Sequence, residues 1–260
     1  MDVRVDNGTR APRWPGTLNT ATREKQTREP ELVVAADEGI SPSLARRALD
    51  VMVAVAMLGL VWPLFLALAV ATRLSTSGSA IYRQRRVGQG GIPFTLYKFR
   101  TMRAQEAGPE VTAPGDRRVT RLGALMRKTS IDELPQMVNV LLGHMTLVGP
   151  RPESVALATR YPNELQFVFR YRPGVTGPCQ VLVRDEKVLG RAADVENFYL
   201  TELVPHRVDM DLDYLKDPTL ARTVRWLVVT LLYLVRTAKP RPGTAHAEFV
   251  RAALARSADD

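Results

Sequence analysis

Two adjacent carboxylates, Asp132 and Glu133 in the segment TSIDELPQ, are the residues of this sequence whose types best suit chemistry. One carboxylate can attack a phosphorus atom, and another can hold a hard cation such as Mg²⁺. A structural role competes, because Ser130 and Glu133 have the spacing of a helix capping box. Pro135 favours a helix that begins near Asp132, where its missing N–H costs little. In either case both carboxylates lie at a helix N-terminus, which also favours a nearby phosphate.

Basic residues lie on both sides of this carboxylate pair in the sequence. They are Lys98 and Arg100 in YKFRTM, Arg127 just before the pair and Arg151 in GPRP. Guanidinium groups can neutralise the charge that develops on the oxygens of a transferring phosphoryl group. Carboxylates among fixed arginines therefore indicate phosphoryl transfer, with surface ion pairs as the open alternative.

The overall charge is strongly basic, with 36 Lys and Arg against 27 Asp and Glu and a formal net charge of +9. This balance favours acidic partners such as nucleic acid, anionic lipid headgroups or phosphate-bearing substrates. We expect no nucleic-acid partner, because no motif for one is present and the aromatic residues are not interleaved with basic ones. The single cysteine, Cys179, excludes an internal disulfide and a cysteine metal cluster. A metal is therefore expected to have oxygen ligands.

An apolar run of 22 residues, 51–72, contains no charged side chain. At about 1.5 Å per residue it is long enough to cross the hydrocarbon core, and soluble helices seldom stay apolar on every face for so long. Arg46 and Arg47 precede the run and Arg73 follows it, which conflicts with the charge asymmetry of a simple spanning helix. Pro63, near the middle, is expected to bend it. These residues leave two arrangements equally open. The segment is either a helical hairpin that enters and leaves the membrane on the cytoplasmic face, or a kinked helix that crosses the membrane once.

Beyond this run the sequence predicts one β-hairpin and a series of short helices. Residues 80–86 and 92–99 alternate partly and are separated by the glycine-rich turn VGQGG. A basic amphipathic helix from about Arg117 suits a headgroup layer or a solvated surface. The segment RPGVTGPCQVLV is expected to be a turn and a strand. Further helices are expected over about 132–142, from Glu153 to Tyr171 with a break near Pro162, and over about 195–204, 208–216 and 219–237.

Four strings in register, KFRTM, DELPQ, LVGPRP and PGVTG, together form a specific pattern. With YRQRRVGQGG and the basic-flanked apolar segment around Pro63, they extend from about Arg46 to Arg236. In these motifs the chain resembles the bacterial sugar transferase family. These are monotopic polyprenyl-phosphate phosphoglycosyl transferases that begin capsule, O-antigen, exopolysaccharide and glycoprotein glycan assembly. The resemblance is to the small, catalytic-core form of the family.

The resemblance implies a fold. It favours the hairpin at Pro63, and with it an α+β, mostly helical protein with a re-entrant membrane helix hairpin, amphipathic interfacial helices and a small β-hairpin. The expected location is the cytoplasmic face of the bacterial inner membrane. The expected division of the chain is a disordered tail over 1–40, the re-entrant membrane helix over 41–75, a catalytic domain over 76–238 and a C-terminal tail over 239–260.

The resemblance also implies a reaction, in which a phosphosugar passes from a UDP-sugar to polyprenyl phosphate, expected to be undecaprenyl phosphate. Asp132 would attack the phosphate next to the sugar and release UMP, and the lipid phosphate would then displace the carboxylate. Glu133 would assist catalysis and bind Mg²⁺. The residues implied to bind substrate phosphates are Lys98, Arg100, Arg127 and Arg151. Downstream glycosyltransferases are further partners that this role allows.

Two positions depart from the pattern of the family. His144 in GHM stands where an aspartate is common, and Trp62 precedes Pro63 where a small polar residue is common. The residues do not identify the sugar, the pathway or the oligomeric state. The alternative function is a non-catalytic, membrane-anchored scaffold that binds phosphates or lipid headgroups within a glycan-assembly complex.

Overall fold

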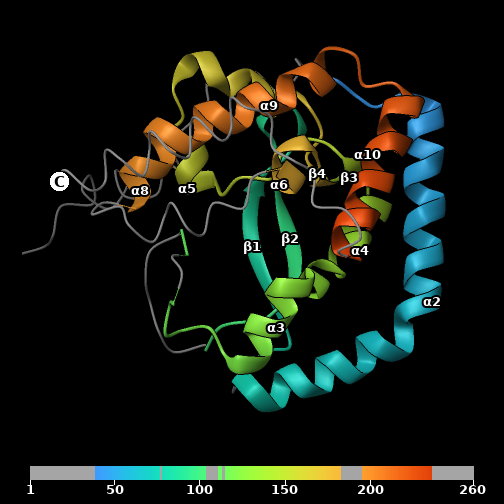
Figure 1. The fold of residues 1–260 in the computed structure, drawn as a ribbon, viewed down its shortest axis with the longest axis vertical. Coiled ribbons are helices and arrows are strands. Elements are labelled where there is room, and N and C mark those ends of the chain that lie inside the picture. Colours follow the sequence, from blue (N-terminus) through green and yellow to red (C-terminus); the bar gives the residue numbers. More distant parts are fainter. Residues whose placement is uncertain (1–38, 77, 104–110, 113–114, 183–194, 236–260) are drawn as a thin grey trace, which may run out of the picture. The chain divides into compact units, whose positions relative to one another are not determined.

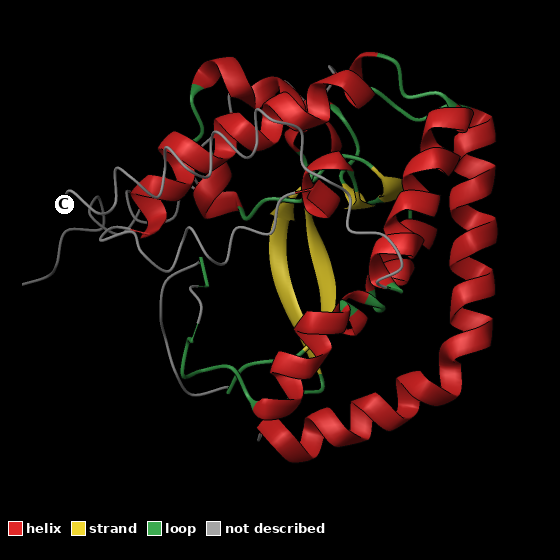
Figure 2. Ribbon diagram, viewed as in Figure 1, coloured by secondary structure: helices red, strands yellow, loops and turns green. Residues whose placement is uncertain are grey.

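The computed structural model describes residues 39–76, 78–103, 111–112, 115–182 and 195–235. Helices predominate in these ranges, with two small two-stranded sheets (Figure 2). The predicted mostly helical class with a small β-hairpin is therefore confirmed. Almost all of the two predicted tails lies outside the described residues, and their division from the rest of the chain stays a prediction.

The longest element is α2, Leu44–Thr76, a helix of 33 residues with Pro63 inside it. Figure 1 shows that α2 changes direction sharply about halfway along its length. Its middle keeps apolar side chains exposed, with Leu60 79% and Trp62 63% accessible. Within the described ranges it is the one helix whose length and composition would let it cross a membrane. The predicted bend in the apolar segment is present, because proline removes a backbone hydrogen bond and its ring displaces the preceding turn.

Both halves of α2 contact the rest of the protein. In the first half the buried carboxylate of Asp50 accepts hydrogen bonds from Thr146 Oγ1 at 2.7 Å and from the backbone N–H of Leu147 at 2.9 Å. In the second half the ring of Phe65 lies 4.7 Å from that of Phe99, centroid to centroid. The helix is therefore held at two places, one on each side of the bend.

Arg46, expected to be one of the basic flanks of the apolar run, is buried instead. Its guanidinium donates to Tyr214 Oη at 2.8 Å, to Thr223 Oγ1 at 3.0 Å and to the carbonyl of Val148 at 3.1 Å. A charge held this way is a structural lock between α2 and the body of the protein. The charge of Arg46 is therefore not available to lipid headgroups. The sequence alone could not reveal this burial.

The predicted β-hairpin is confirmed as β1, Ile81–Val87, paired antiparallel with β2, Pro93–Phe99. The turn contains Gly90 and Gly91, both with positive φ (66° and 75°), a conformation that favours glycine. Partners directly opposite each other share a face of the sheet, and side chains alternate along each strand. The pairs Tyr82–Lys98, Gln84–Leu96 and Arg86–Phe94 therefore place their side chains on one face.

The remaining helices are short, in broad agreement with the prediction. The α-helices are α3 (Arg121–Thr129), α4 (Gln136–Leu141), α5 (Val155–Ala158), α6 (Pro178–Leu182), α8 (Val195–Phe198), α9 (Val204–Lys216) and α10 (Leu220–Leu234). The other helical turns are 3₁₀ at Gln89–Gly91, Ile131–Glu133 and Asn163–Arg170, and π at Tyr199–Leu203.

The second sheet pairs β3, Thr146–Val148, in parallel with β4, Gly174–Thr176. A Cβ on Gly174 would lie 2.1 Å from the backbone nitrogen of Gly149, so only glycine permits this approach. The motifs LVGPRP and PGVTG thus pack against each other, backbone on backbone. The strand expected in RPGVTGPCQVLV is present only as β4: Gln180, Val181 and Leu182 lie in α6, which begins at a proline and is anchored where the N–H of Cys179 donates to Asp211.

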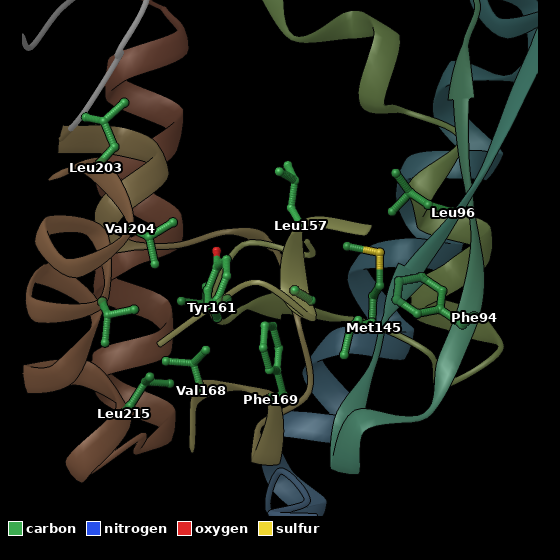
Figure 3. Close-up of a cluster of buried hydrophobic side chains, with 14 of the residues drawn as sticks. Phe94, Leu96, Met145, Leu157, Tyr161, Val168, Phe169, Leu203, Val204 and Leu215 are labelled. Atoms are coloured by element: carbon green, nitrogen blue, oxygen red, sulfur yellow. The ribbon is translucent and has the colours of Figure 1, made fainter. Parts of the chain in front are cut away.

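A hydrophobic core lies between the hairpin and α9 (Figure 3). The hairpin contributes Phe94 and Leu96, and the segment around α9 contributes Leu203, Val204 and Leu215. By contrast α10 buries only Thr223 completely and exposes a row of apolar side chains, Val224, Val228, Leu231, Leu232 and Leu234. This exposure favours an interfacial position for α10.

Candidate active site

The carboxylate pair lies in a tight 3₁₀ turn between α3 and α4. Ser130 ends α3 with φ 57° and ψ 17°, the one non-glycine residue with positive φ in the described ranges. Its side chain caps no backbone N–H of the turn, so the predicted capping box does not form. Asp132 and Glu133 follow within Ile131–Glu133, and Pro135 precedes the first residue of α4. The two carboxylates are therefore free of a capping role and available to a site.

Asn139 of α4 fixes this turn against the hairpin. Its fully buried amide accepts a hydrogen bond from the N–H of Tyr97 at 3.1 Å and donates one to the carbonyl of Thr95 at 2.7 Å. Both partners are backbone groups of β2, the strand that carries Lys98. This clamp sets the position of the carboxylate turn relative to the basic residues of the hairpin.

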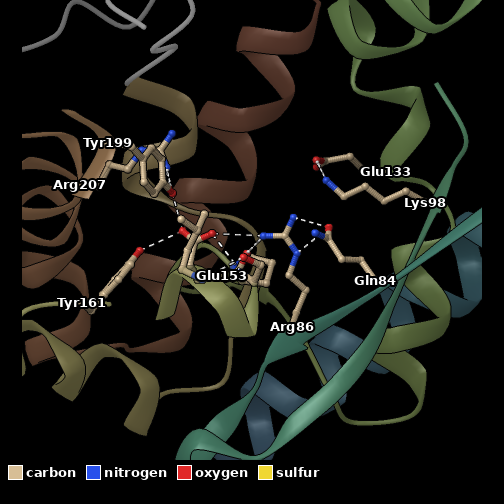
Figure 4. Close-up of polar contacts among 11 residues, drawn as sticks. Gln84, Arg86, Lys98, Glu133, Glu153, Tyr161, Tyr199 and Arg207 are labelled. Carbon is tan, nitrogen blue, oxygen red and sulfur yellow. Dashed lines mark hydrogen bonds and ion pairs between the residues drawn. The ribbon is translucent and has the colours of Figure 1, made fainter. Parts of the chain in front are cut away.

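Glu133 forms an ion pair with Lys98, Oε1 to Nζ, at 2.7 Å (Figure 4). Burial favours the neutral form of the carboxyl group. Lys98, Arg151 and Arg86 outweigh that effect, however, so the pKa of Glu133 lies below its ordinary value. Glu133 is therefore an anion at neutral pH, and about a quarter of its side chain (26%) is accessible to a ligand.

Asp132 has the opposite electrostatic environment. Only 7% of the residue is exposed. Burial, followed by repulsion from Glu133, raises the pKa of Asp132 from 3.8 to about 6, although Lys98 and Arg127 oppose the rise. Two neighbouring carboxyl groups with pKa values displaced in opposite directions are a common feature of catalytic sites. Asp132 is thus ionised at neutral pH but poorly solvated, which suits a nucleophile.

The predicted cations do not all lie at the carboxylates. Lys98 contacts Glu133, Arg151 lines the same pocket as this pair, and Arg127 donates to Thr101 Oγ1 while acting electrostatically on Asp132. Arg100 instead donates to the carbonyl of Ser79 and lies over the ring of Tyr82 at 5.7 Å. No contact described here brings Arg100 to the carboxylates, and its phosphate role stays a prediction.

The pocket contains groups that sequence reasoning did not single out. It is lined by Arg86, Leu96, Lys98, Glu133, Gln136, Arg151, Pro152, Gly174, Val175 and Gln180. Arg86 and Gln136 come from segments of the recognised motifs, but their types alone gave no reason to place them in a site. Gly174 contributes a backbone wall. Three cations around one carboxylate give the pocket a net positive charge suited to an anionic ligand.

A metal would have few protein ligands here. The described residues contain no group of three or more His, Cys, Asp or Glu side chains placed to hold an ion. Glu133 supplies an ionised, accessible carboxylate, and Asp132 is its neighbour. Mg²⁺ commonly takes one or two carboxylates and completes its shell with water and substrate phosphate oxygens. The pair therefore fits Mg²⁺ brought in with a phosphate substrate and does not fit a site made of protein ligands alone.

His144 and Trp62, the two departures from the family pattern, both lie outside the pocket. The ring of His144 packs 5.7 Å from that of Phe94, and Trp62 is exposed on α2. Neither is in contact with the carboxylate pair in the described structure.

Known proteins similar to this chain were found in two comparisons, one with protein families and one with individual proteins. The sequence profile described as "Bacterial sugar transferase" matches residues 41–237. The UDP-glucose:undecaprenyl-phosphate glucose-1-phosphate transferase of Caulobacter vibrioides is 40% identical over 203 residues, 76% of this chain and 72% of that protein. The UDP-N-acetylgalactosamine-undecaprenyl-phosphate N-acetylgalactosaminephosphotransferase of Aeromonas hydrophila is 37% identical, over 72% of this chain but only 42% of that protein. The exopolysaccharide production protein ExoY of Rhizobium meliloti is 38% identical over 55% of this chain and 71% of its own length. The chain therefore belongs to the bacterial sugar transferase family.

Proposed function

We propose that the chain transfers a phosphosugar from a UDP-sugar to polyprenyl phosphate and so forms polyprenyl-diphospho-sugar and UMP. The enzyme is a phosphoglycosyl transferase, and undecaprenyl phosphate is the lipid named in its relatives. The observation that carries the proposal is the poorly solvated carboxylate of Asp132 next to Glu133, whose ion pair with Lys98 lies in a pocket lined by cations. A covalent nucleophile and an anion-binding wall are the two parts that this reaction requires.

The reaction proceeds in two displacements at one phosphorus atom. A carboxylate oxygen of Asp132 attacks the phosphate next to the sugar, and the bond from that phosphorus to the bridging oxygen breaks, so that UMP leaves with the electron pair. An oxygen of the lipid phosphate then attacks the same phosphorus and restores the Asp132 carboxylate. Lys98 and Arg151 neutralise the phosphate oxygens in both steps. Glu133 would hold Mg²⁺, which would supply further positive charge to the diphosphate.

The environment of Asp132 supports this role. A carboxylate with a pKa of about 6 is ionised at pH 7 and above, yet only a small part of its surface is in contact with water. It therefore loses little solvation as it approaches phosphorus. The positive φ of Ser130 just before the turn is a local strain of the kind often found at active sites.

We further propose that α2 enters and leaves the membrane on the cytoplasmic face of the inner membrane. The support is the bend near Pro63 together with contacts from both halves of α2 to the same body (Figure 1). A straight pass would carry the second half away from that body. The exposed apolar side chains of α10 suit the headgroup boundary. The pocket would then lie close to the surface where a lipid phosphate is presented.

The sugar is not assigned. The relatives named above act on glucose and N-acetylgalactosamine derivatives, so membership of the family allows more than one donor. The product class that fits is a lipid-linked intermediate of exopolysaccharide or glycoconjugate assembly, to which further glycosyltransferases would add.

The test is UMP release from a panel of UDP-sugars by detergent-solubilised protein with polyprenyl phosphate and Mg²⁺. Asp132→Asn is compared with Asp209→Asn, which removes an exposed carboxylate of α9. We expect wild type and Asp209→Asn to turn over one donor repeatedly and Asp132→Asn to release no UMP. Equal release by wild type and Asp132→Asn would remove Asp132 from the mechanism. Absence of release from every donor by folded wild type would favour the non-catalytic scaffold.

A further inference from the structure

Arg86 of β1 lies in the wall of the pocket beside the Glu133–Lys98 pair. Its side chain is 14% exposed, and it helps to lower the pKa of Glu133. It shares the face of the hairpin that carries Lys98.

The guanidinium of Arg86 is held from three sides (Figure 4). Its Nε and one terminal nitrogen donate to Gln84 Oε1 at 3.1 and 2.6 Å. The other terminal nitrogen donates to the carbonyl of Pro152 at 3.1 Å and to Glu153 Oε1 at 3.3 Å. A guanidinium group has five N–H bonds, and these contacts use four of them. One N–H therefore remains for a ligand, on a group whose orientation is already fixed.

Glu153 is a buried carboxylate whose own hydrogen bonds are complete. Its Oε2 accepts from the hydroxyls of Tyr161, at 2.9 Å, and Tyr199, and its Oε1 accepts from the N–H of Ser154 at 3.1 Å in addition to Arg86. Burial opposes its charge, but Arg86 and the hydrogen bond from Tyr199 keep the pKa of Glu153 below its ordinary value.

A buried ion pair of this kind adds little to stability compared with apolar residues of the same volume. Its consequence is directional: the carboxylate fixes one edge of the guanidinium, on a side chain that lines the pocket and has one N–H unused by these contacts. Arginine so fixed is well suited to phosphate, because its planar donors match the phosphate oxygens. The other pocket cations differ, since Lys98 is engaged by Glu133 and Arg151 is exposed.

We infer that Arg86 binds a phosphate oxygen of the nucleotide-sugar diphosphate and that Glu153 is the positioning residue that aims it. The inference rests on the proposed function, because it takes the UDP-sugar as the ligand of this pocket. In this assignment Arg86 binds the donor both before reaction and in the transition state, whereas Asp132 performs the covalent step.

The first test measures the dissociation constants of UDP and uridine by equilibrium titration of solubilised protein with Mg²⁺. Arg86→Gln is compared with wild type and with Arg160→Gln, which breaks an exposed arginine–glutamate pair with Glu196 outside the pocket. We expect Arg86→Gln to weaken UDP binding by about tenfold or more, or about 1.4 kcal/mol, and to leave uridine binding unchanged. Arg160→Gln should change neither. Equal weakening of UDP and uridine, or an unchanged UDP affinity, overturns the inference.

Arg86→Lys provides a second variant if Arg86→Gln does not fold. Lysine keeps the charge but loses the planar fork, so we expect UDP binding to weaken by at least about threefold while uridine binding is kept. UDP affinity equal to that of wild type in this variant also contradicts the assignment of Arg86.

The positioning role of Glu153 is tested by a double-mutant cycle on UDP affinity. Glu153→Gln keeps the shape and removes the charge, and we expect it to weaken UDP binding in the wild-type background but not in Arg86→Gln. An equal effect in both backgrounds would show that Glu153 acts on the fold rather than through Arg86. These measurements need no turnover. Wild type that neither binds UDP nor releases UMP refutes the proposed function, whereas wild type that binds UDP independently of Arg86 refutes only this inference.

Discussion

Replacing Asp132 by asparagine is expected to stabilise the protein at neutral and alkaline pH while abolishing its activity. The reason is the unfavourable environment of the Asp132 carboxylate, whose pKa rises from 3.8 to about 6 on folding because of burial and the charge of Glu133. At a pH between these two pKa values, Asp132 has lost its proton in the unfolded chain and has kept it in the folded chain. The contribution of the Asp132 carboxyl group to stability is therefore greatest below pH 3.8 and is lost as the pH rises through about 6.

The size of the effect follows from the displacement of the pKa. A difference of about 2 units at about 1.4 kcal/mol each gives about 3 kcal/mol at pH 8, and less than about 1 kcal/mol at pH 4. For a domain of this size, 1 kcal/mol corresponds to a shift of about 2 to 4 °C in the unfolding midpoint. Asp132→Asn should thus unfold about 6 to 12 °C above wild type at pH 8, with the difference nearly gone at pH 4.

Thermal unfolding of both proteins in one detergent, with a chelator to remove divalent cations, measures the difference across this pH range. Glu133→Gln is the matched control, because the pKa of Glu133 is lowered rather than raised: burial opposes its charge, but Lys98, Arg151 and Arg86 outweigh it. That carboxylate contributes stability above its unfolded pKa, and the contribution is lost as the pH falls. Glu133→Gln should therefore unfold below wild type at pH 8. At pH 8 the two substitutions, at adjacent carboxylates, should therefore shift the unfolding midpoint in opposite directions.

A midpoint for Asp132→Asn equal to that of wild type at pH 8 would refute this account of the site. So would a gain of the same size at pH 4 and pH 8, because a pH-independent effect reports packing or hydrogen bonding rather than a displaced pKa. A gain for both Asp132→Asn and Glu133→Gln would mean that the pair is destabilised as a whole and that Lys98 does not discriminate between its members.

Three other outcomes are expected. In single-turnover UMP release, the rate should fall about tenfold per pH unit below pH about 6, because protonated Asp132 is not a nucleophile; a flat profile down to pH 5 would contradict that role. Asn139→Ala should lower the free energy of unfolding by roughly 2 to 5 kcal/mol, measured by denaturant titration, since it leaves a buried N–H and a buried carbonyl of β2 unpaired. Gly174→Ala should yield little folded protein by size-exclusion chromatography, because its Cβ would lie 2.1 Å from the nitrogen of Gly149; recovery at wild-type levels would mean that the two loops can separate.

Local patterns predicted much of the fold. The alternation on either side of VGQGG identified β1 and β2, because strand period and turn glycines are encoded within a few residues. The apolar period likewise located α3 and α10 within a few residues of their observed bounds. The expected strand does not extend past β4 because Pro178, a residue well suited to begin a helix, starts α6.

The site itself was only partly predictable. Asp132 and Glu133 were identified by their types and by the motif DELPQ, whereas the ion pair between Arg86 and Glu153 joins residues far apart in the sequence. Charge pairing over such a distance has no local pattern. The capping box at Ser130 has the right spacing, but the residue adopts a left-handed conformation as it ends α3, and its side chain makes no capping hydrogen bond to the next turn.

The buried polar contacts of Arg46 and Asp50 in α2 have a consequence for the bilayer. A simple apolar helix adapts to a thicker or thinner membrane by tilting or sliding. In α2, a slide of one residue would remove Asp50 from Thr146 and Leu147 and leave a charge buried without hydrogen bonds. In the proposed membrane arrangement the apolar segment is therefore held at a fixed depth relative to Asp132 and Glu133, and the lipids must adjust their thickness around it. Activity should then depend on acyl chain length in reconstituted membranes, through the height at which the pocket meets the lipid phosphate.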